Sequence, residues 1–176
     1  MNNNNPVHDD ESLTNLIRES SILKDDIRIE AIGSVDEASA ALGLARAYSN
    51  VKQNKEIILK IQGDLHNLMA QLAGMVQPNE ANQFFGQKNV EWLQDVIVAL
   101  KESVPLPSTF ITPGDNIPGG AMAVARTCVR RAERRVVSLR SHNFQLDPIL
   151  VNYLNRLSFV CFMLELSEYA SDQSIS

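Results

Sequence analysis

The chain is poor in the features that mark secreted, disulfide-bonded and zinc-bound proteins. It has only two cysteines in 176 residues, Cys128 and Cys161, and they do not form a CxxC pair. A disulfide scaffold and a structural zinc site both usually require more cysteines at closer spacing. The first twelve residues lack the basic and apolar regions of a secretory signal. We therefore expect a reduced, cytoplasmic protein.

Long apolar runs and an excess of positive charge are also missing. No continuous apolar stretch approaches the roughly 20 residues that cross a bilayer, so we expect no membrane span. The net charge is −5, which argues against a protein built mainly to bind nucleic acid. Residues 126–135 are the local exception, because they contain five arginines and a single acid. A site for an anion is therefore compatible with the acidic total.

The spacing of apolar residues predicts helices and almost no strands. Apolar residues recur at helical intervals in five segments, at about 27–50, 57–75, 90–100, 120–139 and 148–169. Residues 104–120 form a long connection with four prolines and three glycines, and connections of this length are often functional. The pattern predicts an all-α five-helix bundle in one domain over residues 13–170. The polar residues 1–12 are expected to be a disordered tail.

Asp36 is the first candidate functional residue, because it interrupts an otherwise apolar helical segment. Gly33 and Gly43 in the same segment cost about 1 kcal/mol each relative to alanine, which suggests close packing against another helix. A carboxylate buried at such a contact would need a partner. An ordinary surface carboxylate is the alternative, and the residues leave both interpretations open.

The second candidate is the set Arg126, Arg130 and Glu133. Their i, i+4, i+7 spacing places them on one face of a helix. Two guanidiniums offer forked donors and permanent charge to a polyphosphate, while Glu133 could hold an arginine or help to bind a metal ion. The alternative, favoured by the residues alone, is a solvated basic face. Asn155, in the last helical segment, is a weaker candidate that could bind a nucleobase, a ribose or only another polar group.

Several segments together resemble the propanediol-utilisation type of ATP:cob(I)alamin adenosyltransferase. The similarity is carried by Lys24–Glu37 with Leu42–Ala45, by Ile61, Gln62 and Leu65, by ARTCVRRAER at Ala125–Arg134, and by YLNRLS at Tyr153–Ser158. It extends in order over about residues 10–165, and the combination of the last two motifs is specific.

The resemblance implies a homotrimer of helical bundles with an active site between adjacent subunits. It implies transfer of the 5′-deoxyadenosyl group from ATP to cob(I)alamin, giving adenosylcobalamin and triphosphate. Cobalt(I) is itself a strong nucleophile, so the protein's part is to position the ribose 5′ carbon and stabilise the departing triphosphate. Mg²⁺ is expected on the triphosphate, near Glu133, and a reductase is implied as a partner that supplies reduced cobalamin.

The resemblance also implies roles for individual residues. Asp36 would pair with Arg126 across the subunit interface, and Phe110 would help to keep the lower cobalt ligand displaced. Glu133 and Asn155 would position the nucleotide, the metal or an arginine. The expected catalytic residues are Asp36, Arg126, Arg130 and Phe110, and the expected nucleotide-binding residues are Asp10, Thr14, Lys24, Arg28, Arg130, Glu133 and Asn155.

The N-terminal segment departs from the family pattern, which is approximately Thr-Gly-Asp-x-Gly-x-Thr. Asp10 and Thr14 are retained, but the glycines are not. Glycine permits positive φ and lets backbone N–H groups approach phosphate, whereas Asp9 and Glu11 add negative charge beside a polyanion. A catalytically inactive relative that binds a nucleotide or a corrinoid as a sensor or carrier is therefore the alternative. A purely structural trimer is disfavoured, because the arginines are kept.

Further departures lie on the side expected to face cobalamin. Asp115 and Asn116 replace a Gly-Ser pair, and Gly119-Gly120 replaces small helix formers. Ala123 stands where histidine is usual, and Phe159 stands where aspartate usually follows the serine. The loss of that acid either removes a polar anchor or exchanges it for apolar packing.

Overall fold

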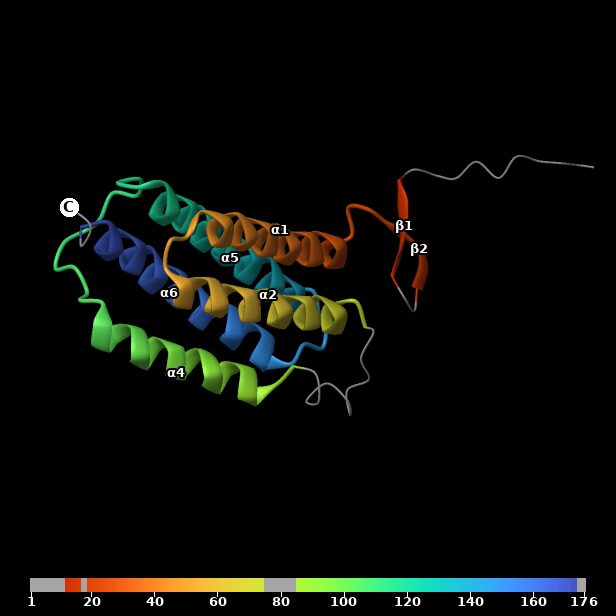
Figure 1. The fold of residues 1–176 in the computed structure, drawn as a ribbon. Helices are drawn as coiled ribbons and strands as arrows, with labels where there is room; N and C mark the ends of the chain where they lie inside the picture. The colour runs from red at the N-terminus through yellow and green to blue at the C-terminus, as the bar shows by residue number, and fades with distance from the viewer. Residues whose placement is uncertain (1–11, 17–18, 75–84, 174–176) are drawn as a thin grey trace, which may run out of the picture.

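The computed structural model describes residues 12–16, 19–74 and 85–173, and these form a helical bundle with a small hairpin at one end (Figure 1). The five helices of the described residues confirm the predicted bundle. The elements are β1 (Leu13–Leu16), β2 (Glu19–Leu23), α1 (Ile27–Tyr48), α2 (Lys52–Leu72), α4 (Gln87–Ser103), α5 (Ile117–Ser141) and α6 (Pro148–Gln173).

The expectation of almost no strands is wrong at residues 13–23. β1 and β2 pair antiparallel, with Leu13 opposite Leu23 and Thr14 opposite Ile22, and the register is irregular before Leu16. Strands this short leave too little alternation to detect in a sequence, because their stability comes from pairing across the hairpin. Most of the predicted tail, residues 1–11, lies outside the described residues.

Side-chain caps determine where two of the helices begin. Asp26 precedes α1, and its carboxylate accepts a hydrogen bond from the Arg28 backbone N–H at 2.8 Å. Asn116 precedes α5 and accepts from the Gly119 N–H at 2.8 Å, with Pro118 in the first turn. Such caps satisfy backbone donors that have no partner within the helix. This cap starts α5 at Ile117, three residues before the predicted position.

The bundle is organised around α5, which packs against both α1 and α6, while α2 packs on α1 and α4 packs on α6. All five helices contribute fully or nearly fully buried apolar side chains to one continuous core. Gly43 confirms the predicted close packing, because an added Cβ would lie 3.0 Å from Gln62 Nε2 on α2. The same prediction is wrong at Gly33, which is exposed and faces open space.

The core helix α6 has no long uninterrupted apolar run, as expected, yet its average composition would allow it to span a bilayer. Pro148–Ser171 is long and apolar enough to do so by length and composition alone, and 56% of its most apolar window is buried inside the bundle. The core helix of a bundle meets the same criterion, because it is apolar on most sides. Its buried acids Glu165 and Glu168 both have polar partners on other helices or connections.

Asp64 on α2 joins three helices through its buried carboxylate. It accepts hydrogen bonds from the Tyr153 hydroxyl on α6 at 3.0 Å and from Asn89 Nδ2 on α4 at 2.8 Å. Lys60, one turn earlier, forms an ion pair with it at 2.9 Å and also lies 3.9 Å from the centre of the Trp92 ring. A buried carboxylate is tolerated only with such partners. Asp64 therefore fixes how α4 and α6 lie against α2.

We predict that Asp64→Ala lowers the free energy of unfolding by about 2–4 kcal/mol, because it leaves the buried Tyr153 hydroxyl and the Asn89 amide without their acceptor. Urea titration followed by circular dichroism measures this change. Asp95→Ala on the exposed face of α4 is the matched control and should shift the value by less than about 0.5 kcal/mol. Equal stability of the two variants would show that Asp64 does not organise the core.

Candidate functional site

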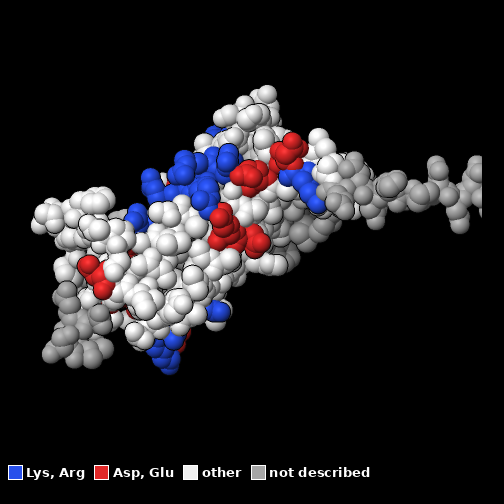
Figure 2. Space-filling view, turned by 90° about the horizontal axis from the view of Figure 1, so that it is seen from above, with Lys and Arg blue, Asp and Glu red and all other residues white. Residues whose placement is uncertain are grey.

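In the described part of the chain, two arginines of α5 form ion pairs with α1, and two others do not. Arg131 forms an ion pair with Glu37, and Arg135 pairs with Glu30 at 3.0 Å, so both bind α1. Figure 2, which views the molecule from the side of α1 and α5, shows a dense patch of basic side chains with acidic ones beside it. Arg131 and Arg135 therefore join α5 to α1, and neither belongs to the predicted set of Arg126, Arg130 and Glu133. Arg130 and Arg134 have no acidic partner among the described residues.

Arg130 and Arg134 line an open pocket of about 300 Å³ together with Glu133, Val137 and Asn155. The pocket is lined by residues of α5 and by Asn155 of α6, and Asn155 Nδ2 donates a hydrogen bond to Glu133 Oε1 at 2.9 Å. Two guanidiniums and one carboxylate leave the pocket with a net positive charge. This arrangement suits a polyphosphate, because arginine offers several donors and keeps its charge.

Two of the predicted site residues, Glu133 and Asn155, meet in this pocket. The expected role of Glu133 in holding an arginine or a metal ion stays a prediction, and within the described residues its carboxylate accepts a hydrogen bond from Asn155. Asn155 is exposed, and its amide binds another polar group, which is one of the roles that the sequence left open. The described residues contain no cluster of three or more His, Cys, Asp or Glu side chains that could hold a metal ion.

Arg126 lies one turn before Arg130 and is held from within the same chain. Its Nε donates to Glu165 Oε2 at 3.2 Å, and its guanidinium carbon lies 5.9 Å from the centre of the Phe162 ring. Glu165 is completely buried, and this burial raises the pKa of its carboxyl, while the positive charge of Arg126 opposes the shift. Asp36, the partner implied by the resemblance, is exposed on α1 and forms no ion pair within the described part of the chain.

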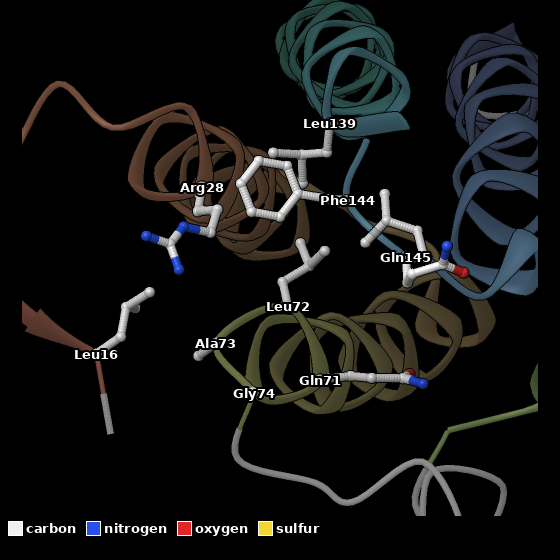
Figure 3. Close-up of a pocket in the computed structure, with 10 residues that line it drawn as sticks. Leu16, Arg28, Gln71, Leu72, Ala73, Gly74, Leu139, Phe144 and Gln145 are labelled. Carbon is white, nitrogen blue, oxygen red and sulfur yellow. The ribbon is translucent and has the colours of Figure 1, made fainter. Parts of the chain in front are cut away.

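A second cationic site lies at the hairpin end of the bundle. Arg28 borders a pocket of about 270 Å³ that is lined also by Leu16 of β1, by the end of α2 and by residues 144–146 (Figure 3). Its guanidinium pairs with Asp26 at 2.9 Å and lies 5.4 Å from the centre of the Phe144 ring. The pocket thus combines a charged group with an aromatic face, although Phe144 was not predicted as a site residue.

The remaining predicted residues lie apart from these two pockets. Lys24 is exposed between β2 and α1, and its backbone N–H donates to the Ser12 carbonyl at 2.8 Å. Thr14 is half-buried in β1, and Asp10 lies outside the described residues. Phe110 is 96% exposed in the α4–α5 connection, which Figure 1 shows at the end of the bundle opposite the hairpin. A single protomer therefore does not bring the predicted residues together.

Sequence reasoning missed Glu165 and Tyr169 on α6. The Tyr169 hydroxyl accepts a hydrogen bond from the Gly114 N–H at 3.0 Å and lies 3.4 Å from Glu165 Oε1. The argument applied to Asp36, that an acid in an apolar helix needs a partner, would have selected Glu165 as well. Its partner Arg126 was in the predicted set, but the pairing itself depends on how α5 docks on α6.

Taken together, the fold and the site define a helical-bundle protein with an arginine-lined pocket of about 300 Å³ between α5 and α6. The chain belongs to the cobalamin adenosyltransferase family, whose model matches residues 7–168.

Relatives with curated descriptions carry the same class of name. The chain is 32% identical over 160 residues to the corrinoid adenosyltransferase PduO of Citrobacter freundii, which covers 90% of this chain and 48% of that protein. It therefore spans about half the length of that relative. It is 32% identical over 164 residues to the corrinoid adenosyltransferase of Mycobacterium leprae, with 88% of this chain and 85% of the relative covered.

Solved structures of this type share the whole bundle. A variant of the PduO-type ATP:corrinoid adenosyltransferase from Lactobacillus reuteri, complexed with cobalamin and ATP, matches with a TM-score of 0.79 and 29% identity. The match covers 93% of this chain and 92% of that one. Another variant of the same protein, complexed with ATP, matches with a TM-score of 0.81 and 28% identity, and 93% of each chain is covered.

The Asp26–Arg28 pair predicts a pH-dependent contribution to stability. Hydrogen bonds from Arg28 hold the pKa of Asp26 below its usual value. A carboxylate with a lowered pKa stabilises the folded state above its unfolded pKa of about 3.9, and this contribution is lost as the pH falls through the folded-state pKa. Asp26→Asn keeps a capping oxygen but removes the charge, so we expect it to lower Tm by about 2–4 °C at pH 7.

The difference in Tm between wild type and Asp26→Asn should shrink as the pH falls below about 4. Thermal melts at a series of pH values from 7 to 3 measure it. Asp95→Asn, an exposed carboxylate on α4, serves as the control and should show no such trend. A difference that stayed constant over this range would mean that the charge of Asp26 contributes nothing.

Proposed function

We propose that this chain transfers the 5′-deoxyadenosyl group of ATP to cob(I)alamin, giving adenosylcobalamin and triphosphate. The observation that carries the proposal is the pocket between α5 and α6, where Arg130 and Arg134 face an open space beside the Glu133–Asn155 hydrogen bond. A triphosphate leaving group develops negative charge, and fixed guanidiniums lower the barrier by stabilising it. The family membership and the L. reuteri complexes with ATP and cobalamin support the same reaction.

We further propose that the complete site forms between subunits of a homotrimer. Within one protomer, Lys24 and Arg28 lie near the hairpin, whereas Arg126 and Arg130 lie along α5. Arginine has five N–H donors, and the Arg126–Glu165 hydrogen bond uses only the one at Nε. The exposed carboxylate of Asp36 on a neighbouring subunit could therefore bind the outer N–H groups of Arg126 without breaking the internal bond.

The chemistry asks the protein to bind and orient, because cobalt(I) is the nucleophile. It displaces triphosphate at the ribose 5′ carbon, so no nucleophilic side chain is required. Glu133 is the one carboxylate among the residues that line the pocket, and Mg²⁺ commonly binds nucleotides through one or two carboxylates together with phosphate oxygens. The residues present therefore fit Mg²⁺, which would neutralise phosphate charge there. A reductase that supplies cob(I)alamin is the expected partner.

One observation favours a second candidate function, in which the chain binds a nucleotide or a corrinoid without catalysis. The segment that should cradle phosphate contains β1, in which Thr14 pairs with Ile22. Backbone groups used in strand pairing are not free to bind phosphate, unlike those of a glycine-rich loop. A sensor or carrier would need only the pockets, whereas the enzyme must also fix the triphosphate.

We predict that Arg130→Ala lowers kcat by about 100-fold in an anaerobic assay with ATP, Mg²⁺ and chemically reduced cob(I)alamin, because one donor to the departing phosphate is lost. Loss of the cobalt(I) absorption and chromatography of adenosylcobalamin give the rate. Arg140→Ala, at the exposed end of α5, is the matched control and should retain full activity.

The same assay separates the two candidate functions. Product formed by the wild-type chain supports the enzyme. ATP-dependent stabilisation in thermal melts without product supports the sensor or carrier, because any ligand of the folded state stabilises it. Normal turnover by Arg130→Ala would contradict the assignment of the α5–α6 pocket to the phosphates.

A further inference from the structure

The C-terminal part of α6 is tied to the α4–α5 connection through Tyr169. The Tyr169 hydroxyl accepts a hydrogen bond from the Gly114 backbone N–H at 3.0 Å. Gly114 has φ +117°, a backbone conformation that favours glycine, so the connection bends sharply at this contact. Asn116 forms a second tie, because its Nδ2 donates to the Glu168 carbonyl at 3.0 Å while its oxygen caps α5.

The position of the Tyr169 ring depends on a missing side chain. A Cβ added at Gly119 would lie 2.2 Å from Tyr169 Cε1 and 2.7 Å from both Cδ1 and Cζ. Real Cβ atoms essentially never approach a ring so closely, so a side chain at position 119 would displace the Tyr169 ring from the first turn of α5. This contact places the hydroxyl within reach of the connection that precedes the helix.

The same hydroxyl lies close to Glu165, the hydrogen-bond partner of Arg126. It lies 3.4 Å from Glu165 Oε1, and the other carboxylate oxygen of Glu165 accepts from Arg126 Nε at 3.2 Å. A tyrosine hydroxyl can donate one hydrogen bond while it accepts another. Gly114, Tyr169, Glu165 and Arg126 therefore form a continuous hydrogen-bonded chain from the connection to α5, and its central carboxylate is completely buried.

Phe110 lies close in sequence to the Gly114 end of this hydrogen-bonded chain. It is 96% exposed and lies four residues before Gly114 on the same connection. A large apolar side chain left in solvent gains free energy when a ligand or a partner covers it. The hydrogen bond between Gly114 and Tyr169 fixes one end of the segment that carries Phe110. Through Glu165, it also fixes that end relative to Arg126.

We propose that Tyr169 is a positioning residue that holds the Phe110 segment in register with Arg126 through Glu165. This inference rests on the proposed adenosyl transfer, in which Phe110 belongs to the corrinoid side and Arg126 to the phosphate side. Tyr169 touches neither substrate in this role. It fixes where the Phe110 segment lies relative to Arg126 before cobalamin binds, so its loss weakens corrinoid binding because the segment must then be ordered on binding.

The test is Tyr169→Phe, which keeps the ring against Gly119 but removes both hydrogen bonds of the hydroxyl. We expect KM for cob(I)alamin to rise about tenfold, because the hydrogen bonds of the hydroxyl to Gly114 and Glu165 no longer hold the Phe110 segment in place. KM for ATP should remain unchanged, since the Arg130 pocket keeps its own contacts. Tyr48→Phe, which alters an exposed tyrosine on α1, is the matched control and should change neither value.

Hydrogen exchange of the protein without substrates gives a second readout that is independent of activity. We expect Tyr169→Phe to accelerate exchange of the Gly114 amide and its neighbours at least tenfold, and Tyr48→Phe to leave it unchanged. Gly119→Ala, which pushes the ring away, should reproduce the faster exchange even with the hydroxyl present.

The outcomes separate this inference from the proposed function. Unchanged exchange in Tyr169→Phe would overturn the tie, and faster exchange with both KM values unchanged would overturn its positioning role. A loss of kcat alone, in proportion to lost thermal stability, would assign Tyr169 to folding and also overturn it. If the wild-type chain forms no adenosylcobalamin, the proposed function is wrong, and so is the positioning role. The exchange data still show whether the hydrogen bond between Gly114 and Tyr169 holds the connection in place.

Discussion

The docking of α5 between α1 and α6 is the contact on which the rest of the structure depends. Alanines at positions 125 and 132 and valines at 129 and 136 are fully buried, so α5 approaches both neighbours closely on one side. Its other sides carry arginines, and these reach the adjacent helices in two directions, toward Glu30 and Glu37 on α1 and toward Glu165 on α6. One helix thus supplies the centre of the core and the cationic pocket, because its small apolar stripe and its basic faces follow the same helical period.

Buried carboxylates connect this packing to function. Asp64, Glu165 and Glu168 are all nearly inaccessible, and each is paired with groups from other helices or connections. A buried acid is costly without such partners, so each specifies one arrangement of the elements it joins. The partners of Asp64 and Glu168 lie outside the predicted site, and they include Tyr153, Asn89, Ser49 and Asn54. Glu165 differs, because its partner Arg126 belongs to the predicted catalytic set and its second contact leads to the connection that carries Phe110.

Three of the residues that depart from the family pattern make specific contacts in this structure. Asn116 caps α5 and binds the Glu168 carbonyl, and Gly119 makes room for Tyr169, so both shape the same end of the bundle. Phe159, where the family usually has aspartate, packs at 6.3 Å from Phe162, and Lys101 lies 5.5 Å from its ring. The replaced acid has therefore been exchanged for apolar packing. Asn116 and Gly119 thus join the start of α5 to the C-terminal part of α6, whereas Phe159 packs separately with Phe162 and Lys101.

The five helices and the basic face of α5 could be predicted from the sequence, because helical periodicity is local and places residues 126, 130 and 133 on one face wherever the helix lies. The β1–β2 hairpin could not, since its strands are short and gain stability only from pairing with each other. The hydrogen-bond partners of the site residues could not be predicted from the sequence either. Arg126 was expected beside Asp36, but within the chain it binds Glu165, and Glu133 binds Asn155. The sequence by itself determined which side chains each helix presents, and only the tertiary structure decided which of them meet, because that depends on how whole helices dock against one another.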